Sequence, residues 1–205
     1  MAHYQPKDRF YRKAKREGLR ARSAFKLEEL LERARPRGLA GGAALDLGAA
    51  PGGWLQLLAR LVGPKGKVVG VDLVDIAPLP APVTTFRGDA REPAVQARLR
   101  AEAPAGYALV TSDMAPKTTG IHGVDCARSL ELVRAALEIA GTLLQPGGAF
   151  FAKIFMGPDV GPFVQRELTP RFERVKQVRP EATREGSREI YLVATGFRQP
   201  TATRA

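Results

Sequence analysis

The chain has 205 residues, of which 44% are hydrophobic, and a formal net charge of +11 at pH 7. This length favours a single domain with a full hydrophobic core. Its one cysteine, Cys126, excludes an internal disulfide and fits a reducing, cytoplasmic setting; we expect it to be a small helix residue without chemistry. We expect neither a membrane span nor a secretory leader, because no apolar run reaches about 18 residues and the N-terminus is polar.

The positive charge is concentrated near the N-terminus. Residues 1–26 contain nine Lys and Arg against two acids, which gives this segment +7 of the total charge. Four aromatic residues are interleaved with these charges: Tyr4, Phe10, Tyr11 and Phe25. Basic side chains suit phosphate contacts and aromatic rings suit base stacking, so we interpret residues 1–22 as a basic RNA-binding segment rather than a solvated tail.

Two helices are predicted before the first strand. After a loose tail over residues 1–8, a short helix is expected over 9–17. A second helix is expected over 24–34, with the Ser23 hydroxyl as its N-cap.

A glycine-rich turn follows, in the stretch A-A-L-D-L-G-A-A-P-G-G-W at residues 43–54. A buried strand over 43–47, a turn and a helix over 54–62 form the first half of a nucleotide-binding βαβ unit. The spacing G-x-x-x-G-G differs from the dinucleotide G-x-G-x-x-G, which disfavours an NAD-dependent oxidoreductase. With Asp46 inside the strand and Asp72 after the next one, the loop is more typical of S-adenosylmethionine (SAM) binding. Another nucleotide or a purely structural turn is the alternative.

The rest of the chain alternates strands and helices. Strands are predicted over 67–71, 83–87, 107–111 and 149–155, and helices over 93–101, 124–144 and 160–168. The last two strands, 172–179 and 190–195, are expected to form a hairpin-like pair around the loop 180–188. This α/β order predicts a Rossmann-like, seven-stranded, mostly parallel sheet with helices on both faces, the layout of class I SAM-dependent methyltransferases.

Three aspartates follow predicted strands: Asp72, Asp89 and Asp113. In such sheets ligands bind beyond the carboxyl ends of the strands. We expect Asp72 to bind the ribose hydroxyls of SAM, Asp89 the adenine amino group and Asp113 to face the sulfonium. Gly52 permits close approach, and Trp54 either walls the pocket or is a core aromatic of the helix.

Two lysines and a glutamate are candidates for chemistry. Lys153 stands inside the apolar strand F-F-A-K-I-F, where an unpaired lysine is rare. Burial beside a second cation lowers the proton affinity of a lysine, which suits a general base. Lys26 in S-A-F-K-L and Glu189 in S-R-E-I-Y-L-V-A are the candidate partners, although each alone is also compatible with a surface position.

These motifs together resemble the FtsJ/RrmJ (RlmE) family of ribosomal RNA ribose 2′-O-methyltransferases. The matching stretches lie in the family's order: S-A-F-K-L, D-L-G-A-A-P-G-G-W, S-D-M-A-P, L-x-P-G-G, K-I-F and S-R-E-I-Y-L-V-A. They span residues 11–197, nearly the whole chain.

The resemblance implies a Lys-Asp-Lys-Glu tetrad and a set of cofactor residues. The tetrad falls on Lys26, Asp113, Lys153 and Glu189, with Lys153 as the base that removes the 2′-hydroxyl proton. The cofactor residues fall on Gly52, Trp54, Asp72, Asp89 and Asp113.

The loop after S-D-M-A-P departs from the family in one place. Lys117 stands where some members carry Asn, and it can add a phosphate contact. His122 is expected to be a polar residue of the same loop. No Cys/His cluster exists in the sequence, so we expect no metal site.

The resemblance therefore implies an enzyme that methylates a uridine ribose of the 23S rRNA A-loop on the 50S subunit, and we expect the protein to be cytoplasmic and monomeric. Its expected segments are the basic segment 1–22, a SAM-dependent methyltransferase domain over 23–198 and a tail over 199–205. The alternatives are the same chemistry on tRNA or another RNA, and a non-catalytic ribosome-assembly factor.

Overall fold

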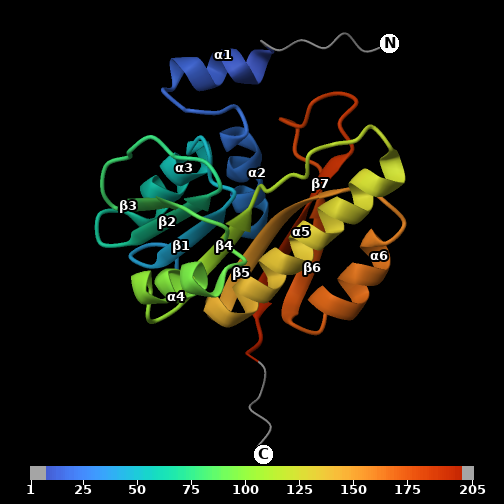
Figure 1. Cartoon of the computed structure of the whole chain (residues 1–205). Helices are drawn as coiled ribbons and strands as arrows, with labels where there is room; N and C mark the ends of the chain where they lie inside the picture. Colours follow the sequence, from blue (N-terminus) through green and yellow to red (C-terminus); the bar gives the residue numbers. More distant parts are fainter. Residues whose placement is uncertain (1–7, 200–205) are drawn as a thin grey trace, which may run out of the picture.

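The computed structural model describes residues 8–199 (Figure 1), so residues 1–7 of the expected basic segment 1–22 and residues 200–205 of the expected tail 199–205 lie outside the described residues. Seven strands form one sheet in the order β3-β2-β1-β4-β5-β7-β6. The strands are β1 (Ala43–Leu47), β2 (Lys67–Asp72), β3 (Val83–Arg87), β4 (Tyr107–Ser112), β5 (Leu144–Phe155), β6 (Phe172–Val178) and β7 (Glu189–Phe197). The helices are α1 (Arg9–Arg16), α2 (Ala24–Ala34), α3 (Gly53–Val62), α4 (Pro93–Glu102), α5 (His122–Leu143) and α6 (Val160–Phe163), which continues as the π-helix η1 (Val164–Leu168).

The pairing of the strands confirms the predicted layout. β3, β2, β1, β4 and β5 are all parallel, whereas β7 runs antiparallel to both β5 and β6. Parallel neighbours need a crossover, and α3, α4 and α5 supply crossovers between successive parallel strands. The last two strands need no helix between them because they pair antiparallel.

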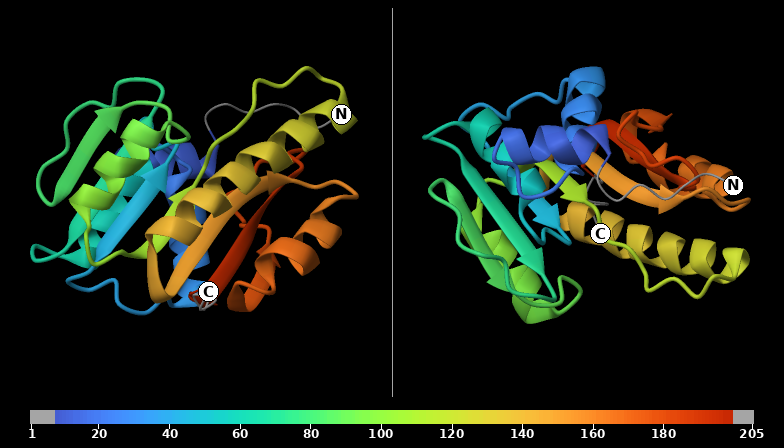
Figure 2. Two further views of the ribbon diagram at one scale, coloured as in Figure 1. Left: turned by 60° about the horizontal axis from the view of Figure 1, so that its bottom comes forward. Right: turned by 90° about the horizontal axis from the view of Figure 1, so that it is seen from above.

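Two hydrophobic cores lie on opposite faces of the sheet (Figure 2). The core beneath α1, α2 and α3 includes Leu27, Leu58 and Phe151, and the core beneath α4, α5 and α6 includes Leu99, Leu137 and Phe163. Strands covered on both faces are apolar along their length, as the sequence shows. The few buried polar residues among the described ones are therefore informative, and they include Asp46 in β1 and Lys153 in β5.

Three local predictions are wrong in detail. α5 ends at Leu143 and β5 begins at Leu144, because Leu144 already pairs with Tyr107 before a register shift in β4. His122 is the first residue of α5 rather than part of the preceding loop. Ser23 precedes α2 as expected, but its side chain makes no capping hydrogen bond.

Candidate active site

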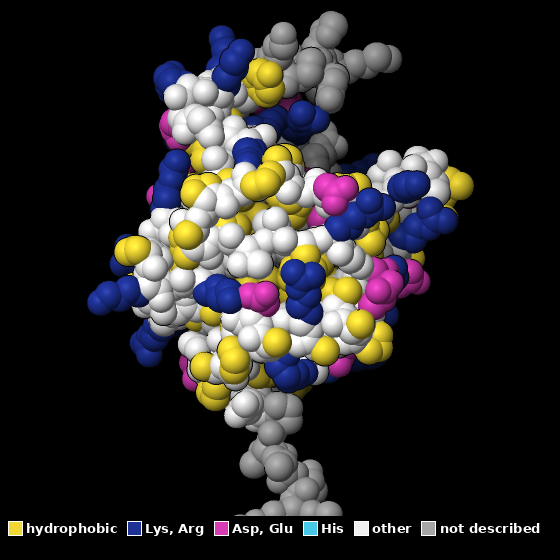
Figure 3. Space-filling model, turned by 60° about the vertical axis from the view of Figure 1, so that its left-hand side comes forward, with side chains coloured by type: hydrophobic (Ala, Val, Ile, Leu, Met, Phe, Trp, Pro, Cys, Tyr) yellow, Lys and Arg dark blue, Asp and Glu magenta, His cyan; other side chains and the backbone are white. Residues whose placement is uncertain are grey.

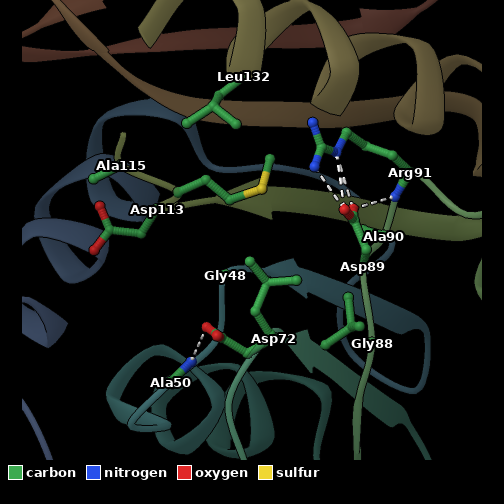
Figure 4. A pocket seen from close by; sticks show the side chains of 13 residues that line it. Gly48, Ala50, Asp72, Gly88, Asp89, Ala90, Arg91, Asp113, Ala115 and Leu132 are labelled. Atoms are coloured by element: carbon green, nitrogen blue, oxygen red, sulfur yellow. Dashed lines mark hydrogen bonds and ion pairs between the residues drawn. The ribbon is translucent and has the colours of Figure 1, made fainter. Parts of the chain in front are cut away.

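The central cavity lies at the topological switch point of the sheet, where the order of the strands reverses between β1 and β4. β1 neighbours β2 on one side and β4 on the other, so the loops after β1 and β4 separate at the carboxyl ends of these strands. A cavity of about 270 Å³ opens there (Figure 4). Its lining comes from the loops after β1 to β4 and from α5: Gly48, Ala50, Val71, Asp72, Leu73, Gly88, Asp89, Ala90, Arg91, Asp113, Met114, Ala115 and Leu132.

The glycine loop approaches the segment after β4 closely. Gly48 has a φ of +75°, and a Cβ placed on it would lie 2.8 Å from Met114 Cγ and 3.1 Å from Met114 N. Gly52, with a φ of +103°, is the N-cap residue of α3 and is buried outside the cavity lining. A larger residue at Gly48 would push the two loops apart, so this glycine sets the width of the floor of the cavity.

Two of the expected cofactor carboxylates face the cavity from β2 and β3 (Figure 4). Asp72 accepts hydrogen bonds from Ala50 N at 2.9 Å and Val74 N at 3.1 Å, so it joins the loops after β1 and β2. Asp89 accepts from Arg91 Nη2 at 2.6 Å and Arg91 Nε at 3.0 Å. The hydrogen bonds from Arg91 hold the pKa of Asp89 below its usual value, so this carboxylate stays charged.

Asp113 lies at the other side of the cavity and contacts Lys153. Lys153 is buried to 9% exposure, and its Nζ lies 2.9 Å from Asp113 Oδ1 and 2.5 Å from the Asp113 carbonyl oxygen. β4 and β5 are adjacent parallel strands, which brings the two residues together at the same edge. The alternative of a lysine escaping to solvent is wrong here, because the ammonium is held by an acid and a carbonyl.

The other two tetrad candidates form a second ion pair beside the first. Lys26 Nζ pairs with Glu189 Oε1, and both side chains are mostly buried. Lys26 comes from α2, which packs over the end of β7, where Glu189 is the first residue. Two cations and two anions from four distant parts of the sequence thus compensate one another.

Tyr191 joins the two ion pairs and was missed in the sequence. Its hydroxyl donates to Asp113 Oδ1 at 2.9 Å, and Lys26 Nζ lies 5.8 Å from the centre of its ring. Tyr191 is opposite Lys153 in the β5–β7 ladder. Burial, and the nearby acids, raise the pKa of Tyr191 above its usual value, so it remains a phenol that donates to Asp113. Its position two residues after Glu189 in a predicted strand was a usable signal, because such residues share a face.

Trp54 lies beside this cluster rather than on the cavity wall. It is 3% exposed, its ring centre is 5.9 Å from that of Tyr191, and its Nε1 donates to the Ser23 carbonyl at 2.8 Å. Of the two alternatives for this residue, the structure shows the buried core aromatic. Ser23 thus contributes its carbonyl oxygen to α3 rather than its hydroxyl to α2.

The loop after β4 is held by Asp125 near the start of α5. Asp125 accepts from Thr119 N at 2.7 Å and Thr119 Oγ1 at 2.8 Å, bonds that keep its pKa below the usual value. Lys117 is exposed in this loop. His122 is exposed, with Nδ1 3.4 Å from Cys126 Sγ. Within residues 8–199, no three His, Cys, Asp or Glu side chains are grouped so that they could hold a metal.

The basic N-terminal helix α1 packs on the domain through the ring of Phe10. Phe10 packs on Phe25, which is 5% exposed, with ring centres 5.8 Å apart. Phe25 is therefore a core residue, and the expectation that it stacks on bases is wrong. Four cations of α1 line a groove of about 560 Å³ (Figure 3 shows basic side chains near α1 at the top): Arg9, Arg12, Lys13 and Arg16, with Phe10 and Glu181.

Comparison with known proteins gives close relatives over almost the whole chain. Ribosomal RNA large subunit methyltransferase E of Anaeromyxobacter dehalogenans is 56% identical over 196 residues, 95% of this chain and 73% of the relative. The protein of the same name from Myxococcus xanthus is 51% identical over 203 residues, 98% of this chain and 94% of the relative.

Solved structures agree on the fold. A Plasmodium falciparum structure described as a ribosomal RNA methyltransferase superposes with a TM-score of 0.77 at 25% identity, covering 88% of this chain and 100% of that one. Human methyltransferase-like protein 13, solved with S-adenosylhomocysteine (SAH), superposes with a TM-score of 0.60 at 18% identity, covering 89% of this chain and 84% of that one, which supports the fold alone. No helix among residues 8–199 is long and apolar enough to cross a membrane.

The family model described as FtsJ-like methyltransferase matches residues 19–197. This range contains all four tetrad candidates and the whole cavity lining. The family match confirms the resemblance found in the sequence and SAM as the cofactor of the family. The solved structures confirm the class I methyltransferase fold. The chain belongs to the FtsJ-like methyltransferase family.

Proposed function

We propose that this protein transfers a methyl group from SAM to the 2′-hydroxyl of a uridine ribose in the A-loop of 23S rRNA on the 50S subunit. The named activity of the relatives, ribosomal RNA large subunit methyltransferase E, supports the ribosomal substrate. The observation that carries the chemistry is the buried Lys153, held by Asp113 at the edge of the cavity. The uridine, the ribose position and the A-loop follow from the family resemblance in the tetrad motifs.

The cavity residues fit a SAM molecule. SAM carries a methyl group on a cationic sulfur, which an aligned nucleophilic oxygen can accept by in-line displacement. A sulfonium favours a nearby carboxylate such as Asp113, and ribose hydroxyls favour a carboxylate such as Asp72. Asp89, kept charged by Arg91, can accept from an exocyclic amino group. Gly52 and Trp54 lie behind the lining, so their role is to shape the loop and the start of α3.

Lys153 is the proposed base. A charged lysine carries three N–H bonds, and two of them are directed to the side-chain and main-chain oxygens of Asp113. A neutral lysine keeps those two donors, and its third position becomes a lone pair that faces away from Asp113. A 2′-hydroxyl at that position would pass its proton to Lys153 Nζ.

The remaining tetrad members position the ribose and hold Lys153 in place. Glu189 is paired with Lys26 and can accept from a hydroxyl, and Lys26 can donate to one. Tyr191 keeps Asp113 oriented by donating to the same oxygen that Lys153 contacts.

The RNA is proposed to bind across α1 and the loop after β4. The groove with four cations on α1 and the exposed Lys117 provide phosphate contacts. Recognition then depends on the charge and shape of a folded RNA. The division into a basic segment and a catalytic domain, the monomeric state and the cytoplasmic location are part of this proposal.

The test is methyl transfer from tritium-labelled SAM to unmethylated 50S subunits, beside free 23S rRNA and tRNA. Ribose label on the 50S rRNA, lost with Lys153→Ala, supports the proposal. Label only on tRNA or another RNA contradicts the ribosomal substrate, and no label on any RNA despite SAH binding indicates an assembly factor. The Lys153→Ala protein must bind SAH like the wild type, so that lost label reports on the base.

A further inference from the structure

The segment between α1 and α2, residues 18–23, lies along the first turns of α3 (Figure 1). Gln56 of α3 binds its main chain at two points: its Oε1 accepts from Arg20 N at 2.8 Å and its Nε2 donates to Gly18 O at 3.0 Å. Trp54 Nε1 binds the Ser23 carbonyl at the far end. The segment is thus attached to α3 along its whole length.

The segment also makes van der Waals contact with the start of α3. A Cβ placed on Gly53 would lie 3.0 Å from Ala21 Cβ and 3.2 Å from Ala21 N. A Cβ placed on Gly52 would lie 3.1 Å from Arg20 Nη1 and 3.2 Å from Leu79 Cδ1. The glycine pair therefore leaves room on the outer side of the loop for this segment.

The Arg20 guanidinium spans two loops from this position. Nη1 donates to Pro51 O at 3.2 Å and to Ala77 O at 2.6 Å, and Nη2 donates to Pro78 O at 2.6 Å. Pro51 belongs to the glycine loop, whereas Ala77 and Pro78 belong to the loop between β2 and β3. The planar fork of an arginine can reach such divergent acceptors, and the single ammonium of a lysine cannot reproduce this arrangement.

The same two loops meet on the cavity side through the hydrogen bond from Ala50 N to Asp72. Arg20 joins them on the opposite side, so the two contacts together fix the separation of the glycine loop and the loop that begins after Asp72. We propose that Arg20 is a positioning residue for the cofactor site, acting through residues 51 and 77–78 rather than by touching the cofactor or RNA. This inference rests on the proposed function, because it assumes that SAM occupies the cavity.

The test compares Arg20→Ala, Arg20→Lys and Gln56→Ala with the wild type and with Arg100→Ala. Arg100 is a matched control, since its guanidinium also binds a main-chain carbonyl, that of Thr142, far from the cavity lining. The measurements are the Kd for SAH by calorimetry, without RNA, and kcat and both KM values on 50S subunits. Thermal unfolding without ligand reports separately on general stability.

Arg20→Ala is expected to raise the SAH Kd about tenfold or more, because charge-assisted hydrogen bonds to two loops are lost. Arg20→Lys should recover only part of this loss, and Gln56→Ala should raise the Kd about threefold without changing the charge. For all three, kcat at saturating SAM should stay within about twofold of the wild type, and Arg100→Ala should leave the Kd unchanged.

An unchanged SAH Kd in Arg20→Ala, with a lower unfolding temperature alone, overturns the inference in favour of a purely structural role. An unchanged SAH Kd with a higher KM for the 50S subunit and a shallower salt dependence also overturns it, because Arg20 is then a phosphate contact. A wild-type protein that binds no SAH contradicts the proposed function itself and the inference with it. If the wild type binds SAH but Arg20→Ala has the same SAH Kd, the inference alone fails and the proposed function is unaffected.

Discussion

The two sides of the active site are built in different ways. On the cofactor side, most of the cavity lining lies between Gly48 and Arg91; there Asp72 accepts from main-chain N–H groups of two loops and Asp89 accepts from the Arg91 side chain. On the acceptor side, Lys26, Lys153 and Glu189 come from three distant segments and are bound to one another or to Asp113. Asp113 alone belongs to both sides.

This difference predicts separate functions for the two sides. The cofactor side presents acids and main-chain groups to a ligand, so its substitutions should change SAM affinity. The acceptor side holds a compensated set of charges, and removal of one member leaves its partner buried without a counter-charge. Substitutions on this side should therefore change the rate of methyl transfer.

Removal of Lys153 should give the largest effect. Lys153→Ala removes the proposed base, and kcat on 50S subunits should fall about 10³-fold, within the usual range for a general base. The SAH Kd should stay within about twofold, because Lys153 lies outside the cavity lining. Single-turnover methyl transfer and calorimetry measure the two values. A parallel loss of SAH affinity would show that the two sides are not separate.

Removal of the Asp72 carboxylate should weaken SAH binding and leave kcat nearly unchanged, the reverse of the Lys153 result. Asp72→Ala should raise the SAH Kd about 30-fold, because a carboxylate that accepts from ligand hydroxyls and from Ala50 N is lost. At saturating SAM, kcat should change only a few-fold. Asp75→Ala is the matched control, since Asp75 is exposed in the same loop and pairs loosely with Arg87 at 3.5 Å. If the control shows the same loss, the effect comes from loop charge rather than from Asp72.

Tyr191→Phe tests the acceptor side and should lower kcat less than Lys153→Ala does. It removes one hydrogen bond to Asp113 and keeps the ring that packs on Trp54, so kcat should fall about three- to tenfold with an unchanged SAH Kd. Tyr107→Phe is the control: its buried hydroxyl donates to Leu99 O at 2.7 Å, away from the site. The control should lower the unfolding temperature without lowering kcat. Equal kcat values for the two variants would contradict the orienting role of Tyr191.

The sequence was sufficient for the alternation of strands and helices because it depends on local patterns, and the family motifs picked out Lys26, Asp113, Lys153 and Glu189, which the structure brings together as two ion pairs. Apolar runs, glycine turns and the strand-end aspartates are periodic or adjacent in the chain, and the tetrad residues stand in family motifs. The contacts that differ from expectation are the ones decided by packing between distant segments. Phe25 is covered by Phe10, and Trp54 is directed to Ser23 and Tyr191 instead of the cavity.

The boundary of β5 and the role of Tyr191 illustrate the same limit. Leu144 joins β5 through its pairing with Tyr107, a partner 37 positions away that no helical period can show. Tyr191 matters because it faces Lys153 across the β5–β7 ladder, and that register depends on two antiparallel strands meeting. In the sequence, nothing distinguishes Arg20 from the other N-terminal cations. Its three carbonyl partners are known only from the structure.

The smallest effect on activity is expected from Asp46, which lies in β1 beneath both sides. Its side chain is 1% exposed, and Thr111 Oγ1 lies 2.8 Å from Asp46 Oδ1 and 3.1 Å from Leu45 O. The threonine has one hydroxyl hydrogen to share between these two acceptors, and a protonated Asp46 that donates to Thr111 Oγ1 would leave that hydrogen for Leu45 O. Burial raises the pKa of Asp46 well above its usual value, which agrees with this arrangement.

The sign of the pH dependence follows from that shift. A carboxyl whose pKa is higher in the folded state contributes stability below its unfolded value, about 3.9, and that contribution is lost as the pH rises toward the folded value. Asp46→Asn keeps a donor to Thr111 and does not titrate. Its free energy of unfolding, relative to the wild type, should therefore increase between pH 4 and pH 8 in urea titrations. Parallel pH curves would mean that Asp46 is charged in the folded protein, and the charges around Asp113 and Lys153 would then no longer balance within the acceptor side.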